Sequence, residues 1–203
     1  MIKTLYPTFR DKWSATGSIY IISDTHFDDA DCKLMNPNWI PAQEATDILK
    51  SQIHKTDTLI HLGDVGNPAY LDQLKCYKIL ITGNHDKISE MEGHFDEIYN
   101  GPLFIADRIL LSHEPILGLE RICLNLHGHV HNGGMLSLTE IEPGKFITSH
   151  INLASDVTQF QPYNLKSLIK AGYLSNVENY HRITIDKATE NSLRENRNEE
   201  NNI

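Results

Sequence analysis

The chain has 203 residues, 40% of them hydrophobic and 22% charged, and its formal net charge is −9 with histidine neutral. Such a chain is long enough for one domain with a sizeable core. Its acidic balance argues against broad electrostatic binding of nucleic acid, and no apolar run approaches the ~18 residues of a membrane span.

Several short apolar runs end in polar, often Gly-rich turns, as buried strands do. These predicted strands cover residues 18–23, 58–62, 78–82, 108–112 and 123–126. Apolar residues at helical spacing behind Pro41 predict a helix over 41–55. Shorter helices are predicted over 68–75 and over 164–172, the latter with Asn164 as its N-cap.

Strands that alternate with helices early in the chain indicate an α/β domain. Two further strands are predicted around the turn "EPGK" at 142–145. We expect one domain over residues 1–189. Residues 190–203 are rich in Asn and Glu and have almost no apolar side chain, so we expect them to form a flexible, solvated tail.

The cysteines give no sign of a disulfide framework. Cys32, Cys76 and Cys123 are odd in number, and no two of them form a C-x-x-C pair. The N-terminal stretch also lacks the apolar core of a signal peptide. We therefore expect a cytoplasmic protein.

Residues of the types that bind metal ions come directly after successive predicted strands. They are Asp24, His26, Asp64, Asn84, His85, His113, His129 and His131. Loops at the carboxyl ends of the strands of an α/β sheet converge on one crevice. Any one of these residues alone is more often a turn former or a hydrogen-bonded structural residue. Residues of these types after each of five successive strands together indicate a metal centre.

The ordered blocks resemble a known family. "SDTHF", "HLGDVGN", "ITGNHDK", "SHEP" and "GHVH" are similar to the calcineurin-like metallophosphoesterase pattern D-x-H, G-D, G-N-H-D/E, H and G-H-x-H. The stretch "INLASDVTQFQPYNL" is a weaker match to small bacterial and phage members, and we assign it no chemistry. The resemblance implies a four-layer αββα sandwich of two mixed β-sheets flanked by helices.

The resemblance also implies two metal sites that share one carboxylate. One site would be held by Asp24, His26, Asp64 and His131, and the other by Asp64, Asn84, His113 and His129. His85 would be no ligand but would face the substrate, as a general acid or as a stabiliser of the transition state.

The charge of these ligands suits a phosphate site. Two carboxylates, one amide and four neutral imidazoles carry a formal charge of about −2, so two divalent cations leave a surplus of about +2. That surplus can bind phosphate and lower the pKa of a bridging water. Mixed N and O ligands suit Mn, which we favour, or Fe, Zn, Ni or Co, rather than Ca.

Three further residues are candidates for supporting roles. Asp86 could orient His85 or be a solvated turn residue. His61 could hydrogen-bond near the site or pack structurally, and His127 is expected to support a ligand or pack beneath the site. The histidines outside the motifs are expected at the surface or in structural roles; they are His54, His94, His150 and His181.

Residues 27–43 form a long irregular segment that is the best candidate for a wall over the metal centre. Trp39 and Met35 could contact a leaving group, although anchoring the segment is the favoured role. Asp28 and Asp29 stand where many small relatives have a Gly-His pair, and their carboxylates would repel a polyanion. No gap between motifs is long enough for a cap domain, so we expect an open site.

The sequence predicts metal-dependent phosphoester hydrolysis by a bridging hydroxide, with a lean toward small phosphodiester or nucleotide-like substrates. A phosphomonoesterase is the close alternative. A non-catalytic scaffold is less favoured because every ligand and His85 are present. A nuclease is disfavoured because no Lys/Arg cluster lies near the motifs. The expected partner is thus a small phosphoester, with no membrane signature, and the oligomeric state is left open.

Overall fold

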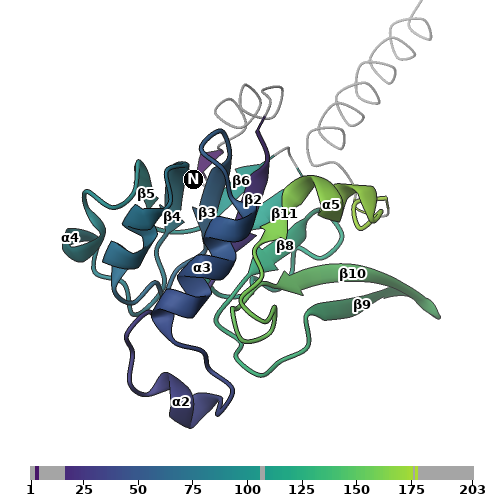
Figure 1. Cartoon of the computed structure of the whole chain (residues 1–203). Coiled ribbons are helices and arrows are strands. Elements are labelled where there is room, and N and C mark those ends of the chain that lie inside the picture. Colours follow the sequence, from purple (N-terminus) through teal and green to yellow (C-terminus); the bar gives the residue numbers. More distant parts are fainter. Residues whose placement is uncertain (1–2, 5–16, 106–107, 176, 178–203) are drawn as a thin grey trace, which may run out of the picture.

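The computed structural model describes residues 3–4, 17–105, 108–175 and 177. Their strands form two mixed sheets packed face to face, with helices outside (Figure 1). The predicted α/β sandwich is confirmed. The predicted tail over 190–203 lies outside the described residues, as does His181.

The five-stranded sheet carries three of the predicted ligand loops. In order across the sheet it contains β11 (Tyr163–Asn164), β2 (Ile19–Ile22), β3 (Thr58–His61), β4 (Tyr77–Ile81) and β5 (Glu97–Tyr99). Strands β2 to β5 are parallel, and β11 is antiparallel to β2. The register places Ile22 beside His61, and His61 beside Leu80. The loops after β2, β3 and β4 therefore leave the same edge of the sheet.

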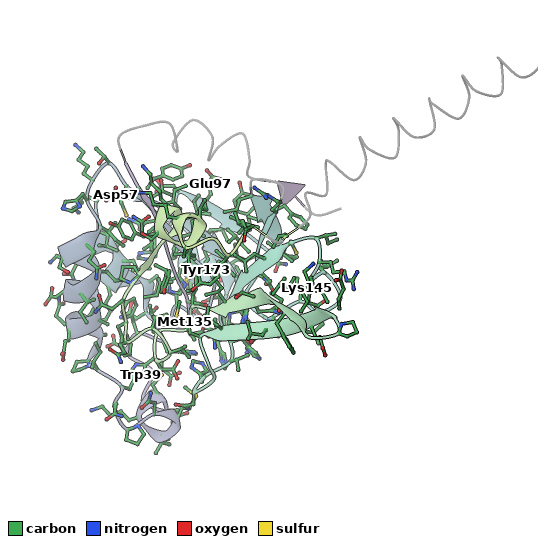
Figure 2. All side chains as sticks on the ribbon, turned by 90° about the vertical axis from the view of Figure 1, so that its right-hand side faces the viewer. Trp39, Asp57, Glu97, Met135, Lys145 and Tyr173 are labelled. Atoms are coloured by element: carbon green, nitrogen blue, oxygen red, sulfur yellow. The ribbon has the colours of Figure 1, made fainter. Side chains whose placement is uncertain are left out.

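The six-stranded sheet supplies the other two ligand loops. Its order is β1 (Lys3–Thr4), β6 (Leu103–Ile105), β7 (Ile109–Leu111), β8 (Leu124–His127), β10 (Lys145–Asn152) and β9 (Leu136–Glu142). Strands β7 and β8 are parallel, so their carboxyl ends also lie at one edge. The predicted hairpin around "EPGK" is confirmed as β9–β10, which projects from the body with Lys145 at its tip (Figures 1 and 2).

An apolar layer fills the space between the two sheets. Ile21, Ile60 and Ile79 of the five-stranded sheet belong to one buried cluster with Leu111 and Leu126 of the six-stranded sheet. Each fully buried side chain of this size contributes about 1.5–3 kcal/mol. This packing fixes the two sheets against each other and so fixes the relative positions of the five loops.

The outer face of the five-stranded sheet is covered by α3 (Ala42–Gln52), which packs Ala45 and Leu49 into a second buried cluster. The predicted helix over 41–55 is too long at its C-terminal end. The carboxylate of Asp57 accepts hydrogen bonds from the backbone N–H groups of His54 and Ser18, at 2.7 Å each. That arrangement draws the chain out of the helix after Gln52.

One other predicted helix differs from the structure, and several short elements were not predicted. Residues 68–75 form a shorter 3-10 helix, η1 (Pro68–Gln73), which Asn67 caps by accepting the N–H of Ala69. The short helices α2 (Cys32–Met35) and α4 (Ile88–Met91) and the strands β5 and β6 were not predicted, because elements of three or four residues show no period.

Within the described residues, no helix is long and apolar enough to cross a membrane.

Helix α5 (Leu165–Lys170) confirms the predicted cap. The side chain of Asn164 accepts the N–H groups of Lys166 and Ser167, and Leu165 and Leu168 are buried against the sheets. We predict that Asn164→Ala lowers the free energy of unfolding by about 1 kcal/mol, because two N–H groups of the first turn lose their acceptor. Urea denaturation measures the change. Asn164→Asp, which keeps the acceptor, should retain stability within about 0.3 kcal/mol; equal losses in both variants would contradict the capping role.

Candidate metal centre

The loops at the strand ends bring all seven predicted ligands together. Asp24 and His26 follow β2, Asp64 follows β3, and Asn84 follows β4, while His113 follows β7 and the last two histidines follow β8. Backbone hydrogen bonds join the first two loops, from the N–H of Asp24 to the carbonyl of Gly63 and from the N–H of His26 to the carbonyl of Asp64. The loops after β2 and β3 are therefore fixed to each other by backbone hydrogen bonds.

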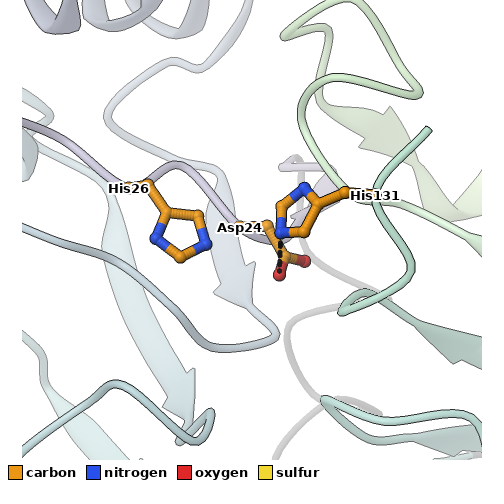
Figure 3. Close-up of side chains that lie close together, drawn as sticks. All are labelled: Asp24, His26 and His131. Carbon is orange, nitrogen blue, oxygen red and sulfur yellow. Dashed lines mark ion pairs between the residues drawn. The ribbon is translucent and has the colours of Figure 1, made fainter. Parts of the chain in front are cut away.

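The first cluster consists of Asp24, His26 and His131 (Figure 3). Nε2 of His131 lies 3.5 Å from Oδ1 of Asp24. The other oxygen of Asp24 accepts the backbone N–H of His129 at 2.9 Å, which turns Oδ1 toward the cluster. Asp24 is fully buried and His26 nearly so.

The second cluster consists of Asn84, His113 and His129. Nε2 of His113 lies 2.8 Å from Oδ1 of Asn84 and 3.1 Å from Nδ1 of His129. Nδ1 of His113 donates to the carbonyl of Leu62 at 3.0 Å, which orients the ring so that Nε2 faces the cluster. Asn84 and His129 are exposed, so this side of the centre opens to solvent.

Asp64 lies between the two clusters. Its Oδ2 is 3.3 Å from Nε2 of His113 and 3.7 Å from Nε2 of His26. Burial raises the pKa of Asp64, but hydrogen bonds from His113 and the backbone N–H of His85, together with nearby imidazoles, outweigh it and lower the pKa to about 2. An ionised carboxylate in this position suits a ligand shared by two cations.

Two buried polar atoms of the centre test whether a metal fits. Asp24 Oδ1 and His26 Nε2 have no hydrogen-bond partner in the described part of the chain. An unpaired buried polar atom costs about 1–3 kcal/mol. Both atoms face the first cluster, and a divalent cation there would coordinate both. The residues therefore fit a metal ion, and their individual roles as ligands stay a prediction.

Asp86 holds the loops rather than orienting His85. Its Oδ2 accepts the backbone N–H groups of Asp64 and Gly83, and its Oδ1 accepts the N–H of Val65, at 2.9 Å each. One carboxylate thus ties the loop after β3 to the loop after β4. Neither the orienting role toward His85 nor a solvated turn describes this residue.

His61 has a supporting role inside the core. Its Nδ1 accepts the N–H of Gly63 at 3.2 Å, so its Nε2 carries the proton and donates to the hydroxyl of Thr25 at 2.9 Å. That hydroxyl donates in turn to the carbonyl of Val65. Burial lowers the pKa of His61 to about 4, which keeps the ring neutral. The ring links the loop that carries Asp24 and His26 to the loop that carries Asp64.

The remaining histidines have structural positions. His127 ends β8, donates from Nδ1 to the carbonyl of Gly128 at 2.7 Å, and packs edge-on against His150. It therefore lies beneath the loop that carries His129 and His131. His94 pairs with Asp72, and His54 is exposed.

His85 is exposed beside the first cluster and belongs to neither cluster. Its backbone N–H donates to Oδ1 of Asp64 at 2.9 Å, and its ring centroid lies 5.6 Å from that of His26. The side chain is thus exposed at the edge of the centre.

Two glycines permit this close approach. A Cβ atom at Gly83 would lie 2.2 Å from Oδ1 of Asp64, and one at Gly128 would lie 2.0 Å from Oδ2 of Asp24. Any side chain at either position would displace a carboxylate of the centre. The glycines of the "GNHD" and "GHVH" blocks are explained by this contact.

The segment 27–43 partly walls the site, as predicted. Trp39 (Figure 2) is buried and packs edge-on against Phe160. Its ring centroid lies 6.0 Å from the ring centroids of both His26 and His131. Its anchoring role is therefore the one observed. Asn132 donates to the carbonyl of Met35 at 3.1 Å, which joins this segment to the loop of His131.

Asp156 is the residue of the site that the sequence analysis missed. Its side chain is fully buried; Oδ1 accepts Nδ1–H of His131 at 3.1 Å, and Oδ2 accepts the backbone N–H of Asn132 at 2.9 Å. A carboxylate behind a metal-binding histidine fixes its tautomer and orientation. Asp156 lies in "INLASDVTQFQPYNL", so the weaker match contains chemistry after all. That match was the only sequence signal pointing to it.

Comparison with known proteins identifies the family to which the chain belongs. The family model of the calcineurin-like phosphoesterase superfamily domain matches residues 18–140. The chain belongs to this superfamily, whose members are metal-dependent phosphoesterases, as its motifs predict.

Two relatives without an assigned function match most of the chain. The "Uncharacterized protein MJ1445" of Methanocaldococcus jannaschii is 29% identical over 170 residues, covering 75% of this chain and 89% of the relative. The crystal structure of the "Protein of Unknown Function AQ665 from Aquifex aeolicus" has a TM-score of 0.62 and 28% identity, covering 77% of this chain and 100% of that chain. These similarities support the fold and leave the substrate open.

We predict that Asp156→Asn weakens the binding of added Mn²⁺ about 10–100-fold, because His131 loses the carboxylate that orients it. Isothermal titration calorimetry of the metal-free protein measures the affinity. Asp72→Asn is the matched control, since it removes the carboxylate of an exposed histidine pair away from the centre. Equal affinities in the two variants, with both folded by circular dichroism, would refute the role of Asp156.

Proposed function

We propose that this protein hydrolyses small phosphodiesters at a centre of two divalent transition-metal ions, with Mn²⁺ as the favoured metal. The observation that carries the proposal is the position of Asp64 Oδ2 between two clusters of nitrogen and oxygen ligands. The two ions, when bound, would supply positive charge for a phosphoryl group and would lower the pKa of a coordinated water.

The protein's own residues orient that charge. Asp24, His26 and His131 would hold one ion, Asn84, His113 and His129 the other, and Asp64 both. Asp86, His61 and Asp156 fix the loops and one imidazole through the hydrogen bonds described above. The ligands are thus held by protein contacts before any ion binds, which reduces the reorganisation that binding requires.

His85 is proposed to give a proton to the leaving oxygen. It is exposed beside the first cluster, and its backbone N–H is fixed by Asp64. A positioned acid of this kind contributes typically about 10²–10⁴-fold to the rate.

Charge favours a diester over a monoester. In the described part of the chain, the lysines that form ion pairs are Lys50, Lys87 and Lys145, and none of them pairs with a predicted ligand. Beside His26, two carboxylates of the segment 27–43, Asp28 and Asp29, outnumber the one nearby lysine, Lys33. A phosphomonoester dianion carries one more negative charge than a diester and gains more from such cations. The exposed Asn84 and His129 also leave room for a second ester group.

The purified protein reconstituted with Mn²⁺ should hydrolyse bis-para-nitrophenyl phosphate with a higher kcat/KM than para-nitrophenyl phosphate. A clear preference for the monoester would reassign the protein as a phosphomonoesterase with the same centre. Hydrolysis of neither compound, with Mn²⁺ bound, would favour the non-catalytic scaffold. Parallel reconstitution with Fe, Zn, Ni and Co tests the choice of metal.

We predict that His85→Ala reduces kcat on phenyl diesters by about 10²-fold or more, and that the loss grows as the pKa of the leaving phenol rises. A weaker acid as leaving group depends more on protonation. Steady-state kinetics over a series of aryl diesters measures this, with Mn²⁺ affinity as a check on the centre. His94→Ala is the control, and a loss independent of the leaving group would rule out proton donation by His85.

A further inference from the structure

A second recess lies directly beside the metal centre. It is a half-open cleft of about 360 Å³, lined by residues 25–30, Lys33, residues 39–43, Ala45 and Tyr70. Its volume falls within the roughly 300–1,000 Å³ typical of ligand sites. The segments that line it come from the loop after β2, the start of α3 and η1.

The cleft and the metal centre share one imidazole. His26 lines the cleft, and its Nε2 faces the first cluster. Its Nδ1 lies 3.4 Å from Oδ2 of Asp29, which is also a cleft residue. A phosphorus atom at the metals could therefore carry an ester group that extends past His26 into the cleft.

The walls of the cleft are largely apolar and aromatic. The rings of Phe27 and Tyr70 lie 5.4 Å apart at 32°, and Trp39 adds a third aromatic side chain beside His26. Ile40 and Ala45 add aliphatic surface. Aromatic faces attract cations through the negative charge of the ring face.

Two carboxylates complete the cleft, and both are held in place. Asp28 accepts the amide N–H of Asn67 at 2.9 Å and the hydroxyl of Tyr70 at 3.0 Å. Asp29 accepts the backbone N–H of Asp31 at 2.9 Å. A carboxylate accepts about four hydrogen bonds, so each retains capacity for a ligand. With Lys33 as the one cationic side chain of the lining, the cleft has a net negative charge.

The backbone conformation of Asp28 also helps to position its carboxylate. Its φ of 63° lies in the left-handed region, which Asp and Asn adopt more often than other non-glycine residues. The bonds from Asn67 and Tyr70 hold the carboxylate at this position. The carboxylate is therefore fixed on the wall of the cleft.

We propose that this cleft binds a positively charged amine on one ester group of the phosphodiester substrate. The proposal rests on the proposed hydrolytic function and names its substrate class. Aromatic walls and fixed carboxylates attract an organic cation, whereas a second phosphate on the substrate would be repelled. A neutral alkyl group would gain only from the apolar walls.

The test uses two diesters that differ only in charge. Para-nitrophenyl phosphocholine carries a quaternary nitrogen, and para-nitrophenyl 3,3-dimethylbutyl phosphate has carbon at the same position. With Mn²⁺ bound, we expect kcat/KM for the cationic diester to exceed that for the neutral one by roughly tenfold. Asp28→Asn, which keeps the shape and tolerates the left-handed backbone, should reduce the ratio to about threefold or less.

The matched control is Glu44→Gln, which removes one negative charge from an exposed position on α3 outside the cleft and should keep the wild-type ratio. Thermal melting of each variant checks folding. Tyr70→Phe removes both the hydroxyl that holds Asp28 in place and part of the electron density of the aromatic wall, so it should also reduce the ratio. A wild-type ratio near one, with both diesters hydrolysed, overturns the cleft proposal alone. Hydrolysis of neither diester, nor of bis-para-nitrophenyl phosphate, overturns the proposed function instead.

Discussion

The carboxylate of Asp64 is the constraint on which the metal centre depends. Its Oδ2 is within 3.7 Å of imidazole nitrogens from both clusters, and its Oδ1 holds the backbone of His85. Asp86 fixes the backbone of Asp64 and of Gly83 at once. A shift of Asp64 would remove the carboxylate that lies between the two clusters and the acceptor that holds the backbone of His85. The loops after β3 and β4 are therefore both positioned by this residue and by Asp86.

The site is built from strained backbone held by paired loops. Asp24, His26, Asp64 and His129 all have positive φ, between 40° and 65°. Such conformations persist only where surrounding structure over-determines them. The parallel strands and the apolar layer between the sheets provide that surrounding structure, and inter-loop bonds such as His61 to Thr25 extend it to the ligands.

The two halves of the centre differ in what lies behind their imidazoles. His26 and His131 have carboxylates behind them, Asp29 and Asp156, whereas His113 has a backbone carbonyl. The carboxylate-backed half is the more buried one and adjoins the acidic cleft, whereas Asn84 and His129 of the other half are exposed. Negative charge therefore gathers on the cleft side, which is where a cationic ester group would be bound and a polyanion repelled.

The sequence by itself determined the family and the strands that carry the motifs. The seven predicted ligands, their order and the strands before them could be read from it, because each loop motif is local and buried strands have a characteristic composition. Only the tertiary structure decided what supports them. Asp86 binds backbone N–H groups more than twenty positions away, and Asp156 reaches His131 across 25 residues. Such partners leave no local period in a sequence, since a hydrogen bond depends on distance in space. The acidic cleft is likewise formed by segments that meet only when the chain is folded.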